Sequence, residues 1–367
     1  MKVGILTFHR TLNYGAILQC YALFQTLCNM GYDVEVIDYR PAYLEKYRIF
    51  FYWRDFRKMR FPQKLKMLIF LPLSYLNKKK TTAVFDSFIG NNIKLSAYVK
   101  GTDDIPKYDA IIFGSDQIWN PRICEGFDPL FWGQFPKGKT KFISYAASLG
   151  TPQVITKHQW EIINEYIKSF DSISVRESKS KEYLMVKGMS INTVLDPTLL
   201  ANEDIFERIS AKPNETKYIL LYMLEYDRKA ISFANRIAKE KGLKLIRLQA
   251  ISSPSLTRRE YTEVVPKSVG EFVGYFKHAD YIVNVSFHGT AFSIIYRKDF
   301  YTMRSKNFER AYGLLNSLGL LSRFVSSEEN VQISDIDYSH INILLERMRD
   351  NSKCFITESL KNKLHQL

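Results

Sequence analysis

The sequence predicts an α/β fold made of two doubly wound domains, each a parallel sheet with helices on both faces. Three observations indicate this fold class. Short apolar, β-branched runs alternate with stretches of helical periodicity along the chain. With 367 residues, the chain is long for one hydrophobic core and about right for two domains of ordinary size. A polar stretch at residues 202–216 interrupts the alternation before it resumes, which places the domain boundary there.

The first domain is predicted over residues 1–205 and the second over residues 206–367. The strands expected in the first are residues 2–8, 33–39, 109–113, 141–146, 172–175 and 193–195. A helix over residues 15–30 follows the first strand, and Gly31 ends it. The second domain is expected to contain strands at residues 218–224, 244–248, 281–285 and 300–302, and helices at residues 228–241, 268–278 and 289–296. The tail from residue 333 is expected to form one or two closing helices.

Composition excludes several classes of protein. Hydrophobic residues make up 46% and charged residues 25%, which is typical of a globular chain. The N-terminal apolar run is too short for a signal peptide, and residues 67–73 fall well short of the roughly 18–20 residues of a membrane span. A cytoplasmic protein is therefore expected. The four cysteines show no paired metal-ligand spacing, and no phosphate-loop or Gly-x-Gly-x-x-Gly sequence occurs, so neither a metal nor ATP or NAD is expected.

A basic, aromatic insertion is predicted at about residues 44–82. Between residues 46 and 80 there are eleven Lys or Arg and one acid, Asp55, which gives a net charge of +10 out of the chain's +14. One interpretation is a solvated helical insertion packed on the body of the protein. The other is a patch that binds an anionic membrane surface, since basic residues attract anionic headgroups and aromatic residues enter the interface. Nucleic acid is not expected as a partner, because no nucleic-acid module accompanies the segment.

Polar residues stand at the carboxyl ends of several predicted strands, where open α/β sheets bind ligands. Asn13 and Gly15 follow the first strand and precede a helix whose backbone N–H groups can hold an anion. A plain helix cap is the alternative for these two residues. On the first of these two interpretations, Asn13 and Gly15 are predicted to contact substrate.

A second group follows the strand at residues 109–113. Ser115, Asp116, Gln117 and Asn120 combine an acid with amides beside a tryptophan, which suits the hydroxyls of a sugar. Asp116 is a candidate general base. Its alternative role is to cap a helix.

An arginine ends the strand at residues 172–175. Arg176 is suited to clamp a carboxylate or a phosphate through two parallel hydrogen bonds. It could equally form an ion pair with the adjacent Glu177. Further along, Asp196 ends another strand before Pro197, and a turn is the simplest interpretation of it.

A histidine follows the strand at residues 281–285. His288 is predicted to lie near the positive end of the next helix, among Ser286, Gly289 and Thr290. A helix N-terminus disfavours an imidazolium unless an anion binds nearby, so His288 is suited to contact phosphate or to exchange a proton with substrate. A histidine packed in the core is the alternative. Ser286, Gly289 and Thr290 are predicted to bind substrate.

A set of motifs resembles the polysaccharide pyruvyl transferase family. In order along the chain they are LNYGAILQCYALFQTL, VEVIDYRP, IIFGSDQIWNP, YAASLG, SVRE, VLDPTLL and SFHGTAFSIIY. The resemblance covers about residues 3–320, apart from the basic insertion, and GSDQIWNP and SFHGTAFSIIY are its most specific parts. Some members carry Asn-x-Gly-Asp-Glu in the first loop, where this chain has Ala16 and Ile17 after Gly15.

The resemblance implies two Rossmann-like domains arranged as in B-type glycosyltransferases, with a cleft between them. It also implies transfer of pyruvate from phosphoenolpyruvate to two hydroxyls of one sugar, which makes a cyclic ketal during cell-surface or exopolysaccharide synthesis. An acid, an arginine and a histidine matter for activity in related enzymes, and by position these are Asp116, Arg176 and His288. The expected partners are phosphoenolpyruvate and a free or lipid-linked sugar, with no cofactor, and the expected location is the cytoplasm or the inner face of the membrane.

The chemistry assigns roles to these residues. Protonation of the donor's methylene carbon needs an acid, for which His288 is the first candidate, and Asp116 would act as base on a sugar hydroxyl. Arg176 would hold the donor's carboxylate or phosphate. The roles of Asp116 and His288 are interchangeable at this level. Two alternatives remain: a nucleotide-sugar-dependent glycosyltransferase of similar fold, and a non-enzymatic protein that binds membrane or nucleic acid.

Overall fold

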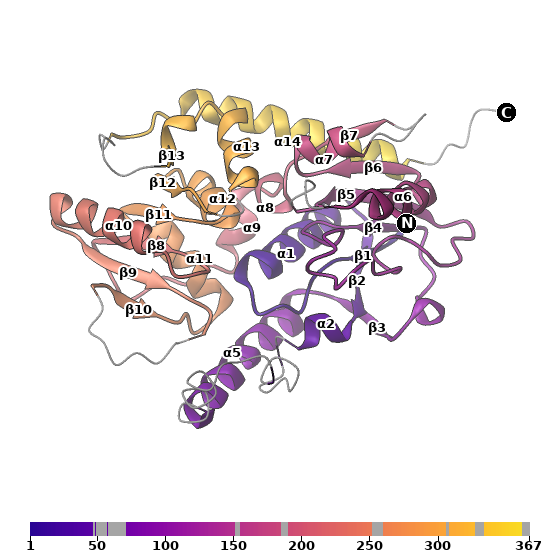
Figure 1. Cartoon of the computed structure of the whole chain (residues 1–367), viewed down its shortest axis with the longest axis horizontal. Coiled ribbons are helices and arrows are strands. Elements are labelled where there is room, and N and C mark those ends of the chain that lie inside the picture. Colours follow the sequence, from indigo (N-terminus) through magenta and orange to yellow (C-terminus); the bar gives the residue numbers. More distant parts are fainter. Residues whose placement is uncertain are drawn as a thin grey trace.

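Two parallel α/β units lie side by side in the structure, as Figure 1 shows. The computed structural model describes residues 1–46, 48, 57, 71–150, 155–184, 190–251, 260–305, 308–326 and 334–361. Every strand pair recorded within the two sheets is parallel. The predicted fold class, with two doubly wound domains, is therefore confirmed.

The first sheet has seven strands in the order β3-β2-β1-β4-β5-β6-β7. Its strands are β1 (Lys2–Leu6), β2 (Asp33–Tyr39), β3 (Leu95–Val99), β4 (Ala110–Phe113), β5 (Lys141–Ala147), β6 (Ser172–Val175) and β7 (Ile191–Thr193). The helices of this part of the chain are α1 (Tyr14–Asn29), α2 (Ala42–Glu45), α5 (Leu71–Asn92), α6 (Lys157–Tyr166), α7 (Ser178–Tyr183), α8 (Pro197–Leu200) and α9 (Glu203–Glu207), with 3-10 turns η1 (Thr102–Asp104) and η3 (Ile167–Ser169).

The second sheet has six strands in the order β10-β9-β8-β11-β12-β13. Its strands are β8 (Tyr218–Tyr222), β9 (Lys244–Leu248), β10 (Thr262–Val264), β11 (Tyr281–Asn284), β12 (Asp299–Met303) and β13 (Phe324–Val325). The helices are α10 (Arg228–Lys241), α11 (Val269–His278), α12 (Phe287–Ile295), α13 (Glu309–Ser317) and α14 (Ser339–Leu360), with the 3-10 turn η4 (Leu321–Arg323).

The strand order reverses once in each sheet, between β1 and β4 and between β8 and β11. A crevice opens outside the carboxyl ends of the strands at such a point, because the connections on either side run to opposite faces of the sheet. At the first reversal Leu6 is in register with Phe113, and at the second Tyr222 is in register with Asn284. The segments that follow these residues carry the predicted site residues.

Helix α1 lies between the two domains. Asn13 begins it, since its side chain accepts hydrogen bonds from the backbone N–H groups of Gly15 and Ala16. Almost every residue of α1 is buried, and Tyr14 stacks on Phe272 of α11 with ring centroids 4.3 Å apart. One apolar core cluster includes residues of both domains, while each sheet has a further cluster on its other face. An apolar core is therefore continuous across the contact between the domains.

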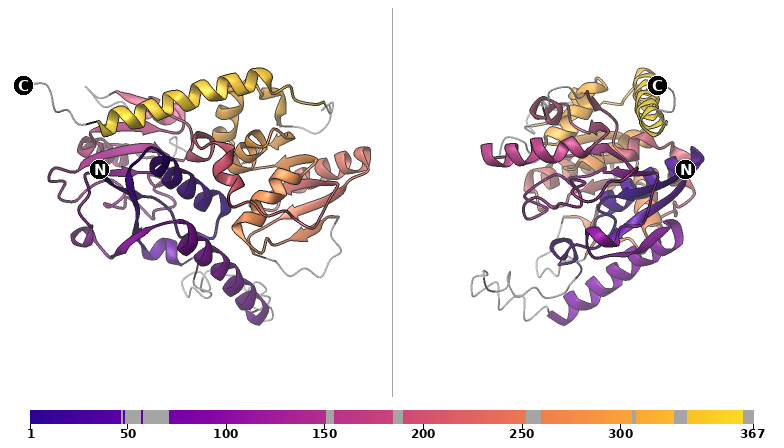
Figure 2. Two further views of the ribbon diagram at one scale, coloured as in Figure 1. Left: turned by 180° about the vertical axis from the view of Figure 1, so that it is seen from behind. Right: turned by 90° about the vertical axis from the view of Figure 1, so that its right-hand side faces the viewer.

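The C-terminal helix α14 contacts both domains, and the left view of Figure 2 shows it running across them. At its start the Tyr338 hydroxyl donates to the Lys298 carbonyl, 2.6 Å away, in the second domain. In its later turns Arg349 Nε donates to the Leu199 carbonyl at 2.7 Å in the first domain. The division at residue 205, which falls within α9, stays a prediction, and α14 joins the two units.

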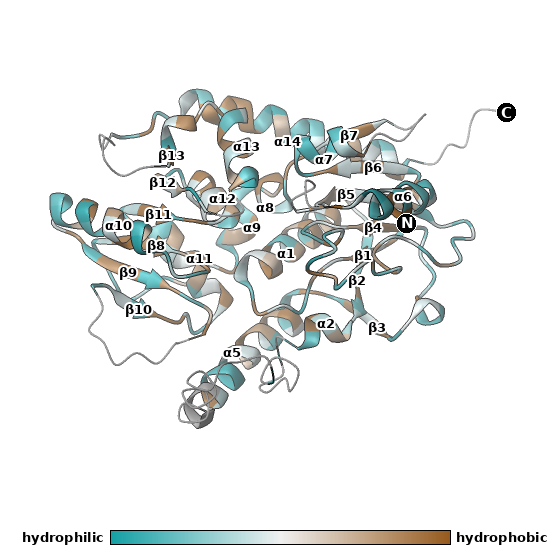
Figure 3. Cartoon of the chain, in the orientation of Figure 1, coloured by the Kyte–Doolittle hydropathy of each residue, from teal (hydrophilic) through white to brown (hydrophobic). Residues whose placement is uncertain are grey.

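Three edge strands, β3, β10 and β13, were not predicted. Among the helices, α13 had no predicted counterpart. α5 begins inside the predicted insertion, for which a helical structure was one interpretation, and continues past it to Asn92. Thr81 of α5 donates to the Ala250 carbonyl at 2.8 Å, so this helix reaches from the first domain to the second. In Figure 3, α10 and α14 carry both hydrophilic and hydrophobic residues, as helices with one buried side do.

Most of the basic, aromatic segment at residues 46–80 lies outside the described residues, so its binding to an anionic membrane surface stays a prediction. None of the helices in the described ranges carries an apolar stretch that is long enough to cross a bilayer. The described end of the segment, at the start of α5, exposes Tyr75 and Leu76.

Candidate functional site

Two adjacent cavities lie at the carboxyl ends of the strands. The first has a volume of about 490 Å³, and both domains contribute to its lining. Its polar lining residues include Asn13, Asp116, Gln117, Ser286, His288 and Arg310. The second cavity, of about 500 Å³, is lined by Arg176, Glu177 and Asp196 among others. Phe287, Phe308 and Arg310 line both cavities and so form the wall between them.

Asp116 reaches the first cavity from the turn that follows β4. The turn requires a glycine before it, because a Cβ on Gly114, whose φ is +123°, would lie 2.1 Å from the Tyr145 carbonyl oxygen of β5. Asp116 itself has φ +73°. Its backbone carbonyl accepts a hydrogen bond from the Ser148 N–H at 3.0 Å, so its own main chain is fixed against the end of β5.

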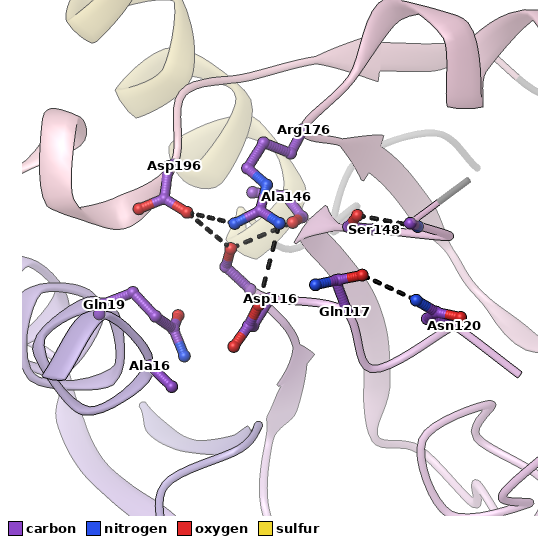
Figure 4. Close-up of polar contacts among 12 residues, drawn as sticks. Ala16, Gln19, Asp116, Gln117, Asn120, Ala146, Ser148, Arg176 and Asp196 are labelled. Carbon is purple, nitrogen blue, oxygen red and sulfur yellow. Dashed lines mark hydrogen bonds and ion pairs between the residues drawn. The ribbon is translucent and has the colours of Figure 1, made fainter. Parts of the chain in front are cut away.

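Arg176 is buried at the end of β6 and contacts three carboxylates. Its Nη1 donates to Asp196 at 2.7 Å and its Nε to Glu177 at 3.0 Å, while Nη2 lies 3.8 Å from Asp116 Oδ1. Figure 4 shows Asp196 and Asp116 on either side of the guanidinium. Burial alone would lower the pKa of Arg176, but Glu177, Asp196 and Asp116 together raise it above its ordinary value. The ion pair with Glu177 that the sequence left open is therefore present, and it is partly buried.

Asp196 is the main residue of this cluster that the sequence interpretation missed. It is almost fully buried, and its Oδ1 accepts hydrogen bonds from the N–H and hydroxyl of Thr198, as the cap of the short helix α8. Its Oδ2 accepts from Arg176 and, at 3.4 Å, from the Ser115 hydroxyl. Burial would raise the pKa of Asp196, but Arg176 first and then His288 lower it, so this carboxylate stays ionised. Asp196 follows a predicted strand, where site residues are expected, and this position could have identified it. The sequence was instead interpreted as a simple turn.

His288 reaches the first cavity from the first turn of α12. Its Nε2 lies 3.9 Å from Asp196 Oδ2 and has no hydrogen-bond partner among the described residues. Burial lowers the pKa of His288, and the opposing effect of Asp196 and Asp116 does not restore it. The imidazole is therefore neutral around pH 7 when no anion is bound, and a bound anion would favour its protonation.

In the part of the chain that the structure describes, three buried polar atoms without a hydrogen-bond partner belong to residues that line these cavities. Within the described residues, Thr11 Oγ1, Arg176 Nη2 and His288 Nε2 are buried and make no hydrogen bond. An orphaned buried polar atom costs free energy, so such atoms are expected where a ligand supplies the missing partner. Their side chains come from segments far apart in the sequence, and together they point to a polar or anionic ligand.

Gly15 contacts the imidazole of His288 across the domain interface. A Cβ at this position would lie 2.2 Å from His288 Nδ1, a separation that real Cβ atoms do not show. The glycine of the first loop therefore leaves space for the histidine of the second domain. This is a positioning role, and it differs from the substrate contact that the sequence predicted for Gly15.

We expect Gly15→Ala to lower turnover by about 10- to 100-fold, because the added methyl group displaces the imidazole from its position. The kinetic constants and the melting temperature of the purified variant test this. Gly90→Ala in α5 is the matched control, since a Cβ at Gly90 meets nothing within 4 Å. The control should retain full activity and gain helix propensity. An active Gly15→Ala enzyme would show that the histidine tolerates displacement.

The other predicted substrate-binding residues divide into two groups. Asn13, Gln117 and Ser286 line the first cavity, although Asn13 and Ser286 also cap α1 and α12. Ser115 and Thr290 do not face it: both are fully buried, and Thr290 Oγ1 bonds to Asn284 and Thr302.

Asn120 and Gly289 also lie away from the cavity. Asn120 donates to the Gln117 side chain at 2.7 Å, a contact drawn in Figure 4. A Cβ on Gly289 would collide with Asn284. The structure therefore gives these two residues, like Ser115 and Thr290, supporting contacts inside the protein.

Two charged residues at the site had no signal in the sequence. Glu225 enters the first cavity from the loop after β8, and Arg310 enters both cavities from the first turn of α13. Among the described residues, no group of three or more His, Cys, Asp or Glu side chains could hold a metal ion.

Comparison with known proteins gives a family match. A family model described as polysaccharide pyruvyl transferase matches residues 13–307, which is most of the chain. No curated protein sequence matches the chain.

Several solved structures match the chain at low sequence identity. They include UDP-GlcNAc 2-epimerase from Neisseria meningitidis bound to UDP-GlcNAc, at 10% identity and a TM-score of 0.49 over 98% of this chain and 99% of that one. The UDP-N-acetylglucosamine 2-epimerase from Rickettsia bellii has 11% identity and a TM-score of 0.49 over 98% and 96% of the chains. The glycosyltransferase SnogD from Streptomyces nogalater has 10% identity and a TM-score of 0.43 over 98% and 99%. Similarities of this size say nothing of the chemistry of this chain.

Proposed function

Because the chain belongs to the polysaccharide pyruvyl transferase family, we propose that it transfers pyruvate from phosphoenolpyruvate to two hydroxyls of one sugar. The product is a cyclic ketal, and inorganic phosphate is released. The observation that carries the proposal is that Asp116 and His288 line the first cavity and Arg176 lines the adjacent one. Arg176 lies within 4 Å of Asp116, and Asp196 faces both Arg176 and His288. A donor with a carboxylate and a phosphate would supply partners for the orphaned atoms there.

The residues supply an acid, a base and a cation for this reaction. His288, protonated when the anionic donor binds, gives a proton to the methylene carbon, which leaves the central carbon cationic. Asp116 takes the proton of the first sugar hydroxyl as its oxygen bonds to that carbon. The bond from carbon to the phosphate oxygen then breaks, its electron pair leaves with phosphate, and the second hydroxyl closes the ketal. One hydroxyl proton replaces the proton lost by His288 and the other leaves with phosphate.

The cluster around Arg176 fits this scheme because it holds the base close to a cation that can contact the donor. Arg176 Nη2 lies 3.8 Å from Asp116 Oδ1, and Arg176 lines the second cavity, so it is placed to contact the donor's carboxylate. Asp196 holds the other side of the same guanidinium and faces His288. The acid and the base are thus fixed relative to one another through one buried network.

The proposed function is tested by incubating the purified protein with phosphoenolpyruvate and a panel of free and lipid-linked glycosides. We expect phosphate release that depends on the acceptor, together with a pyruvyl ketal detected by mass spectrometry. Nucleotide-sugar donors run in parallel distinguish the alternative enzyme class. Release of UDP or GDP without phosphate release from phosphoenolpyruvate would replace the proposal with a glycosyltransferase.

The pH profile tests the role of His288 as the acid. Asp196, Asp116, Arg176 and Arg310 act on its charge, and burial holds its pKa below the ordinary value of 6.5 in the free enzyme. Since the protonated form is the active one, kcat/KM for phosphoenolpyruvate should fall as pH rises through that lowered pKa. The bound donor adds negative charge, so the corresponding fall in kcat should come at a higher pH.

His288→Gln is the control for this profile. The donor phosphate titrates in the same range, so a fall that persists unchanged in the variant belongs to the donor. If kcat/KM instead rises with pH in the wild type and this rise is absent in the variant, His288 is the base and Asp116 the acid.

A further inference from the structure

Arg310 is held at the wall between the two cavities by an aromatic cluster. Phe308, which precedes α13, packs against Phe324 with ring centroids 5.6 Å apart, and Tyr312 packs against the same ring at 5.3 Å. Ala311 is buried on the adjoining face of the helix. The first turn of α13 is therefore fixed, and it places Arg310 where it lines both cavities.

No described residue forms an ion pair with Arg310. Arg310 also makes no hydrogen bond with any residue in the described ranges, whereas Arg176 makes ion pairs with three carboxylates. Burial, and then repulsion by Arg176, lower the pKa of Arg310, so the carboxylates nearby do not offset its charge. The same environment raises the pKa of Arg176. A bound anion would therefore give Arg310 a partner that the described residues do not supply, whereas Arg176 already has three carboxylates around it.

A donor with two anionic groups needs two cationic contacts. Arg176 Nη1 and Nε already donate hydrogen bonds to Asp196 and Glu177, so Nη2 is the nitrogen that can donate to a ligand. Asp116, Glu177 and Asp196 would repel a phosphate, which carries the larger charge, unless a second cation lay close to it. The guanidinium fork of Arg310 matches the geometry of phosphate oxygens, and α12 directs its positive end towards the same wall.

We propose that Arg310 binds the phosphoryl group of the donor, and that Arg176 Nη2 contacts the donor's carboxylate. This assignment rests on the proposed function. As the bond from carbon to the phosphate oxygen breaks, the electron pair goes to that oxygen, and Arg310 stabilises the charge that develops there. Arg310 is thus a catalytic residue, supplied by the second domain, for a donor that also contacts the first.

Arg310→Gln tests the assignment. We expect it to raise the KM for phosphoenolpyruvate and the inhibition constant of inorganic phosphate by about 10- to 100-fold, the effect of losing a hydrogen bond to a charged group. The KM for the acceptor and the inhibition by pyruvate, which has the carboxylate alone, should change little. Arg310→Lys keeps the charge without the fork and should recover part of the loss. Arg228→Gln, which removes an exposed arginine from the first turn of α10, is the matched control and should behave as wild type.

The outcomes separate this assignment from the proposed function. If wild type turns over phosphoenolpyruvate and Arg310→Gln keeps its phosphate inhibition constant, Arg310 does not bind the phosphoryl group. If Arg310→Gln loses inhibition by pyruvate but keeps inhibition by phosphate, the assignment is also overturned. Arg310 would then bind the carboxylate of the donor, and Arg176 the phosphoryl group. If wild type neither binds nor turns over phosphoenolpyruvate, the proposed function itself fails. Should the glutamine variant be unfolded, the lysine variant carries the test, and an unchanged phosphate inhibition constant there overturns the assignment.

Discussion

Replacing His288 with glutamine or alanine is expected to lower turnover by about a hundredfold or more, with little change in melting temperature. The imidazole lines the first cavity, and its Nε2 makes no hydrogen bond with the described residues, so its removal breaks no such bond of the fold. What is lost is the proton donor to the methylene carbon. Steady-state kinetics with phosphoenolpyruvate and a thermal melt of each variant measure the two effects separately.

A second histidine provides the control for this experiment. His158 in α6 is exposed and lies 3.5 Å from Glu161 in a surface ion pair. His158→Gln should therefore change neither activity nor stability by a measurable amount. If His288→Gln melts at a much lower temperature while each folded molecule keeps its activity, His288 is a packed core residue without a chemical role.

Asp196→Ala is expected to lower the free energy of unfolding by about 3–5 kcal/mol, because it leaves the buried Arg176 without its closest partner. The change also removes the cap of α8 and an acceptor for Ser115. Activity should fall as well, since Asp196 fixes Arg176 and faces His288. Denaturant unfolding followed by fluorescence, with the melting temperature as a second probe, measures the loss.

The control for Asp196 is the same substitution at an exposed carboxylate. Asp204 pairs with Arg208 at 3.3 Å on the surface of α9, and Asp204→Ala should cost less than about 1 kcal/mol. In a double-mutant cycle, Asp196→Ala combined with Arg176→Met should cost less than the sum of the two single changes, because neither charge is then left unpaired. An Asp196→Ala protein as stable as wild type would mean that the ion pair is not needed by the fold.

The long elements of the fold could be predicted because their signals are local. Helix α1 has an asparagine cap at its start and Gly31 just after its end, and the strand before it, β1, is an apolar run that is almost entirely buried. The missed strands lack this signal. β3 is half-exposed and β10 is partly exposed, and they form because their backbones pair with β2 and β9, which no pattern within the strand itself reveals.

The candidate site was predictable only in part, for a related reason. The rule that ligands bind at the carboxyl ends of parallel strands placed Asp116, Arg176 and His288 near one another from the sequence alone. The rule does not say which of the residues next to these three have side chains that face a cavity. Ser115 and Thr290 turned out to bond within the protein, since the direction of a side chain depends on the backbone of its own turn.

The sequence by itself determined the two parallel α/β domains, the family motifs and the three strand ends that meet at the cavities. Only the tertiary structure decided that Asp196 pairs with Arg176, that Gly15 leaves space for His288, and that Arg310 lines both cavities with no ion-pair partner among the described residues. Each of these contacts joins residues that are distant along the chain. Their distances are set by how α1, α8, α12 and α13 pack across the domain interface, and no local pattern of residues records that packing.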